Sequence, residues 1–170
     1  MPATVGKLGR MIFGAWFVGA LYLALAAVTA AVGMGGGGDL GALLVPWAAG
    51  MLLGASVSFG VGARISSLRR AVRTEGRGNW GAAEIGARLR PLKLLWLVAL
   101  ALTAAAGLAA LATHGGTGRA MAGIGTVMGM VMQLQPGALL WSASRTFNEF
   151  AREVAAETGR GRPPGPYYRP

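Results

Sequence analysis

Four long stretches of the chain contain no Asp, Glu, Lys or Arg, namely 11–38, 40–63, 94–118 and 120–144. Each is longer than the roughly 20 apolar residues with which an α-helix crosses a hydrocarbon layer of ~30 Å. A helix pairs all its backbone N–H and C=O groups internally, as lipid requires. The pattern therefore predicts an all-α, polytopic membrane protein. Its four transmembrane helices, in two hairpins, are expected over about 11–33, 40–64, 92–113 and 119–144.

Amphipathic segments follow the second and fourth predicted spans. Ile65, Leu68 and Val72 recur at helical spacing, and so do Phe147 and Val154. We expect each segment to continue its span as a short cytoplasmic helical extension, completing a single domain over 1–158. The cytoplasmic loop is predicted at 65–91.

Turn residues suggest how this loop and the chain end are organised. Asn79 is suited to cap a turn in which Trp80 lies at the membrane interface, and Pro91 is suited to open the third helix. The segment 159–170 is rich in Pro and Arg and is predicted to be a disordered tail.

The basic residues are distributed very unevenly. Of the sixteen Lys and Arg, fifteen lie within 1–10, 64–93 and 145–170, the segments that flank the charge-free stretches on one side. Basic residues near span ends are retained in the cytoplasm, so both termini and the 65–91 loop are predicted to be cytoplasmic, in the inner (plasma) membrane. This rule accounts for the net charge of +10 without a nucleic-acid partner. Membrane lipids are the expected partner, with headgroup contacts predicted at Arg69, Arg70 and Arg73.

Tryptophans fall near the predicted span ends. Trp16, Trp96 and Trp141 are expected at the inner interface and Trp47 at the outer one, as in the aromatic belts of membrane proteins. A weak internal similarity at an offset of 81 residues, which pairs Arg64 with Arg145, leaves open whether the two hairpins are a repeat.

Few residues offer chemistry. The chain has no cysteine, and apart from Arg64, Lys93 and Arg119 at their ends the predicted spans contain no ionisable acid, base or histidine. The single histidine, His114, has only Asp39 and Met121 as conceivable co-ligands. The glycine pattern at 36–41 resembles a dinucleotide fingerprint but lacks the strand that such a fingerprint follows. We therefore predict no catalytic residue, no cofactor and no metal site, and a protein that is not an enzyme.

Small residues recur at every fourth position in the second and fourth spans. In lipid, helices associate through close backbone approach at such stripes and through interhelical hydrogen bonds. The stripes are predicted helix-packing faces, either within the chain or toward a partner. They comprise Gly50, Gly54, Ser58 and Gly62 in the second span and Gly125, Gly129 and Gly137 in the fourth.

Two amides and a proline interrupt the fourth span. Gln133 continues the glycine stripe near the middle of the membrane, and Gln135 points about 200° around the helix from it. Pro136 has no N–H for the carbonyl of Met132, so a kink is predicted. Two functions remain open. The first is a subunit or assembly partner of a membrane complex, or a homo-oligomer. The alternative is a channel or facilitator for a small solute that uses the Gln133, Gln135 and Pro136 kink.

Overall fold

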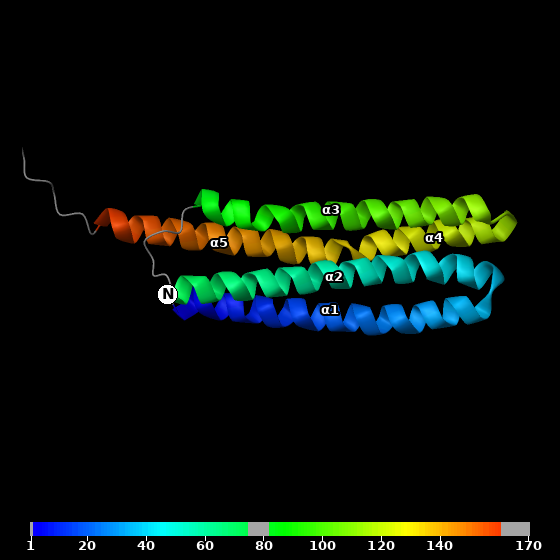
Figure 1. Ribbon diagram of the computed structural model, residues 1–170, viewed down its shortest axis with the longest axis horizontal. Helices are drawn as coiled ribbons and strands as arrows, with labels where there is room; N and C mark the ends of the chain where they lie inside the picture. Colours follow the sequence, from blue (N-terminus) through cyan, green and yellow to red (C-terminus); the bar gives the residue numbers. More distant parts are fainter. Residues whose placement is uncertain (1, 75–81, 161–170) are drawn as a thin grey trace, which may run out of the picture.

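The computed structural model describes residues 2–74 and 82–160, which form five α-helices and no strand. The helices lie side by side as long rods, with α4 and α5 end to end in one row (Figure 1). The predicted all-α class is confirmed. The helices are α1 (Pro2–Gly36), α2 (Gly38–Thr74), α3 (Ala82–Thr113), α4 (Gly116–Met132) and α5 (Leu134–Arg160).

Glycines make the two tight turns at one end of the bundle. Gly37 and Gly38 have φ angles of 58° and 48° between α1 and α2, and Gly116 has a φ of 53° where α4 begins. This left-handed backbone is readily adopted only by glycine. Asp39 joins the two turns, because its carboxylate accepts a 2.5 Å hydrogen bond from the hydroxyl of Thr117.

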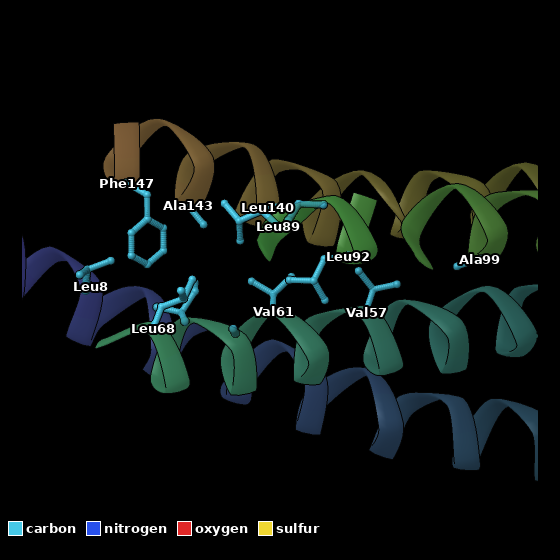
Figure 2. Packing of buried hydrophobic residues seen from close by; sticks show 12 residues of the cluster. Leu8, Val57, Val61, Leu68, Leu89, Leu92, Ala99, Leu140, Ala143 and Phe147 are labelled. Carbon is cyan, nitrogen blue, oxygen red and sulfur yellow. The ribbon is translucent and has the colours of Figure 1, made fainter. Parts of the chain in front are cut away.

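Helix α2 lies at the centre of the arrangement. It packs against each of the other four helices, whereas α1 packs mainly on α2. The apolar core near the end that holds the N-terminus is formed by side chains from α2, α3 and α5, with Leu8 and Ala15 of α1 (Figure 2). Val57, Val61 and Leu68 of α2 face Leu140 and Phe147 of α5 across this core.

Large apolar side chains are concentrated on the outside of the bundle. Phe13, Leu108 and Trp141 are 72%, 67% and 69% exposed, whereas Thr103 and Gln133 are fully buried. Within residues 2–74 and 82–160, three helical segments are long and apolar enough to cross a membrane. They are Gly6–Gly36, Gly38–Arg70 and Leu89–Thr113.

The fourth predicted span is not a single helix. Helix α4 ends at Met132 and α5 begins at Leu134, so the break falls at Gln133 rather than at Pro136. Pro136 has no N–H to donate to the carbonyl of Met132, so the helical hydrogen-bond pattern is interrupted in the turn before Pro136. The helical extensions predicted after the second and fourth spans are present. Helix α2 continues without interruption to Thr74, and α5 continues beyond residue 144.

Pro91 does not open the third helix as predicted. Helix α3 begins at Ala82 and contains Pro91 in its interior. A proline removes one backbone donor, and here Leu89 and Leu92 are buried on either side of it, so packing holds the helix together. The predicted turn at Asn79 and Trp80 and most of the predicted tail lie outside the described residues.

Candidate polar site at the break between α4 and α5

The backbone changes its hydrogen-bonding pattern where α4 meets α5. The N–H of Gln133 donates to the carbonyl of Met130 at 3.0 Å, and the N–H of Gly137 donates to the carbonyl of Gln133 at 3.2 Å. Position 136 would normally supply the donor for Met132, but proline has none. The break thus leaves the Met132 carbonyl dependent on a donor from another helix.

Side chains of α1 and α3 supply donors at this break. The hydroxyl of Tyr22 donates to the Met132 carbonyl at 3.1 Å, and the indole Nε1–H of Trp96 donates to the Gln133 carbonyl at 2.9 Å. Tyr22 lies on α1 and Trp96 on α3, so two helices distant in sequence meet the same break. A backbone group left unpaired in an apolar interior would be costly.

Gln133 is directed toward α2. Its side chain is fully buried, and its Nε2 donates to the carbonyl of Gly50 at 2.7 Å. Its Oε1 is buried and has no hydrogen-bond partner among the described residues. The amide therefore links α2 to the break through its nitrogen alone.

Gln135 turns to the opposite side. It is exposed, and its Oε1 lies 2.7 Å from the Tyr22 hydroxyl, which donates to it. A hydroxyl has one proton, so it divides this proton between Gln135 and Met132. Pro136 is buried against the same region. The structure thus places the three predicted residues at one break but turns the two amides to different neighbouring helices.

The predicted glycine stripes lie against this site. A Cβ added to Gly50 would overlap the backbone of Gly129, and one added to Gly125 would overlap the carbonyl of Leu43. A Cβ at Gly54 would lie 3.1 Å from the ring of Tyr22, and one at Gly137 would lie 2.8 Å from the ring of Trp96. These glycines therefore occupy interfaces within the chain.

The last two stripe residues lie further along α2. A Cβ added to Gly62 would lie 3.0 Å from Nε1 of Trp16 on α1. Ser58 is fully buried, and its hydroxyl has no hydrogen-bond partner among the described residues. Both residues face inward, as the other members of the α2 stripe do.

The predicted headgroup arginines differ in exposure where their side chains are described. Arg69 is half-buried, with its Nε enclosed and Nη1 3.8 Å from where a Cβ of Gly9 would stand. Arg70 is exposed and has an interaction partner. Arg73 belongs to α2, but its side chain lies outside the described part.

Sequence reasoning missed Tyr22 and the contacts of Trp96. The interfacial position predicted for Trp96 stays a prediction, and in addition its ring packs on Gly137 and its Nε1–H donates to the Gln133 carbonyl. For Tyr22, the available signal was a hydroxyl inside an otherwise apolar stretch. Such a group needs a partner in an apolar environment, although the sequence does not say which.

His114 does not gather other ligand groups. Its Nδ1 lies 2.9 Å from the carbonyl of Ala110 and 3.1 Å from the hydroxyl of Thr113. Asp39 accepts from Thr117 instead. Among the described residues, no group of three or more His, Asp or Glu side chains is placed to hold a metal ion.

Comparison of the chain with models of protein families, with curated proteins and with solved structures found no match.

Proposed function

We propose that this chain is an integral membrane protein with four spans, the fourth made by α4 together with the first part of α5. One observation carries this proposal. Large apolar side chains such as Phe13, Val127 and Trp141 are exposed, whereas Thr103 and Gln133 lie inside. Water penalises such an apolar exterior, and soluble proteins rarely expose large apolar patches. Lipid does not penalise it.

The charges support one orientation in the membrane. The two glycine turns lie at one end of the bundle, and the N-terminus and the end of α5 lie at the other (Figure 1). Exposed Lys7, Arg10, Arg90 and Arg145 accompany the second end. By the positive-inside rule this end is cytoplasmic, in the inner (plasma) membrane.

Single cysteines test the orientation cleanly, because the chain has none of its own. In whole cells, Gly35→Cys and Gly115→Cys should react with an impermeant thiol reagent, and Ser67→Cys should react only after the cells are opened. All three positions are exposed. The reverse pattern would overturn the orientation, and solubility of the protein without detergent would overturn the membrane assignment.

Within the membrane we assign the protein a non-catalytic role, as a subunit or assembly partner of a membrane complex or as a homo-oligomer. The α2 and α4 stripes are occupied by contacts within the chain, so a partner needs another face. Helix α3 offers one, since only 17% of its apolar stretch is buried in the bundle. Ala101 and Ala105, one turn apart on α3, are exposed and would permit close helix approach.

Mild extraction from the native membrane tests this role. We expect a mass above that of the monomer or a co-purifying protein, whereas a strict monomer without a partner would refute the proposal. An oxidative cross-link at Ala105→Cys distinguishes the two cases. A homo-oligomer joined through α3 should cross-link there and not at the matched exposed control Val127→Cys on α4. A hetero-complex should give no cross-linked homodimer with either variant.

A solute pathway is the second candidate, favoured by Oε1 of Gln133. This buried oxygen has no partner in the described part of the chain, and transporters place broken helices at such sites. Flux of a neutral solute into vesicles should then fall with Gln133→Leu and change less with Gln135→Leu. Flux that Gln133→Leu leaves unchanged would exclude this site.

A further inference from the structure

A groove with a volume of about 450 Å³ lies between α1 and α5 at the end that holds the N-terminus. It is lined by Lys7, Arg10 and Arg145, by the hydroxyl residues Ser142 and Thr146, and by Met11 and Glu149. Three cations thus face one carboxylate. The groove is separate from the polar site at the break, and it contains none of the three arginines predicted to contact headgroups.

The cations in the groove remain available to a ligand. Lys7 and Arg10 are exposed, and neither forms an ion pair with an acid among the described residues. Arg145 contacts Glu149 through Nε at 3.3 Å, and both side chains are largely exposed, at 70% and 45%. Exposed pairs of this kind are weak. The guanidinium keeps its remaining N–H donors, a geometry that suits phosphate.

Exposed aromatic rings follow the groove cations along both helices. Phe13 lies one helical turn from Arg10 on α1, and Trp141 lies one turn from Arg145 on α5. They are 72% and 69% exposed, and Phe13 stacks on Phe17 with ring centroids 6.2 Å apart. Each of the two helices therefore presents an exposed cation in the groove and an exposed apolar ring one turn further from the chain end.

We infer that this groove binds one anionic phospholipid of the inner leaflet, with its phosphate held between Arg10 and Arg145. Its acyl chains lie along Phe13 and Trp141. The inference rests on the proposed membrane location. The positive charge complements a phosphodiester, and basic pockets between membrane helices on the cytoplasmic side suit anionic headgroups. A soluble phosphate would gain nothing from the exposed rings, whereas a lipid contacts both the cations and the rings.

Native mass spectrometry of the full chain, with phosphatidylglycerol or phosphatidylcholine added at equal concentration, tests the inference. The chain should retain one phosphatidylglycerol and no phosphatidylcholine. Arg10→Gln/Arg145→Gln should weaken retention about 30-fold, since each basic residue contributes about a fivefold factor near anionic lipid. The matched control Arg90→Gln/Lys93→Gln removes two exposed cations of α3 that do not line the groove and should leave retention unchanged.

A second variant keeps the test decisive if the double variant does not fold. Glu149→Gln removes the carboxylate from the groove and should strengthen phosphatidylglycerol retention about fivefold. Equal loss in both double variants, or no change with Glu149→Gln, would overturn the site. Displacement of the lipid by millimolar glycerol phosphate would show a site for soluble anions and would also overturn it.

Failure of this site is distinguishable from failure of the proposed function. If the protein inserts in the bilayer and retains a partner but shows no lipid selectivity, only the lipid site in the groove is refuted. A protein that is soluble without detergent loses both.

Discussion

The indole nitrogen of Trp96 on α3 lies 2.9 Å from the carbonyl oxygen of Gln133, at the residue where α4 gives way to α5. This contact joins a helix to the backbone break that Pro136 produces. Tyr22 acts in the same way from α1, on the carbonyl one residue earlier. The break is therefore stabilised by α1 and α3, and its geometry depends on the packing of the whole bundle.

Trp96→Phe should reduce the free energy of unfolding by about 1 kcal/mol, because it removes the N–H donor while preserving most of the ring. Reversible unfolding in mixed micelles measures the change. Trp141→Phe is the matched control, since that side chain is 69% exposed and has no hydrogen bond in the described part. Equal shifts for the two variants would show that the Trp96 hydrogen bond contributes nothing.

Tyr22→Phe should also destabilise the protein by roughly 0.6 to 1.7 kcal/mol, the range of interhelical hydrogen bonds in lipid. A double-mutant cycle with Gln135→Ala separates the two acceptors of the hydroxyl. Since Tyr22 and Gln135 are 2.7 Å apart, we expect a coupling energy of about 0.5 kcal/mol or more. If the destabilisations of the two single variants simply add, the effect of Tyr22→Phe comes only from the lost hydrogen bond to the Met132 carbonyl.

The sequence predicts features that depend on the local chain and misses those that depend on contacts between helices. Charge-free length predicts helices, and Pro136 predicts an interruption, because both depend on the local chain. The donors to that interruption depend on which residues of other helices lie at the same depth. No periodicity gives the relative depth of α1, α3 and α4, so the contacts of Tyr22 and Trp96 with the break were missed.

Pro91 illustrates the same limit from the other direction. Local rules place a proline in the first turn of a helix, but α3 runs through it because buried Leu89 and Leu92 hold the helix against its neighbours. Pro46 lies likewise inside α2 and is buried. Packing outweighs the loss of one backbone hydrogen bond at both positions, whereas the helix is interrupted at Gln133, three residues before Pro136, which lies in the first turn of α5.

Gly50→Ala should destabilise the bundle by about 1 to 3 kcal/mol, the usual cost of overpacking. Its Cβ would overlap the backbone of Gly129, and backbone cannot rotate away as a side chain can. Gly14→Ala is the control, because nothing lies within 4 Å of the added Cβ. The control should be neutral or stabilising by up to ~1 kcal/mol through helix propensity. If both variants unfold alike, the close approach of α2 and α4 is wrong.

Gln133→Leu provides the sharpest contrast with Tyr22→Phe. Tyr22→Phe orphans the Met132 carbonyl, whereas Gln133→Leu orphans no backbone group, because the Gly50 carbonyl lies inside α2 and a helical carbonyl already accepts the N–H four residues on. Leucine also removes the buried Oε1, which has no partner among the described residues. Removing an unsatisfied buried group offsets the loss of one hydrogen bond.

The unfolding free energy of Gln133→Leu should therefore stay within about 1 kcal/mol of the parent protein. Gln133→Ala is the size control and should lose about 2 kcal/mol or more, because it leaves a cavity. A loss of more than about 2 kcal/mol with leucine would mean that Oε1 is bonded in the membrane. Water held at the break would then be the partner, and the solute pathway would gain weight over a purely structural role for Gln133.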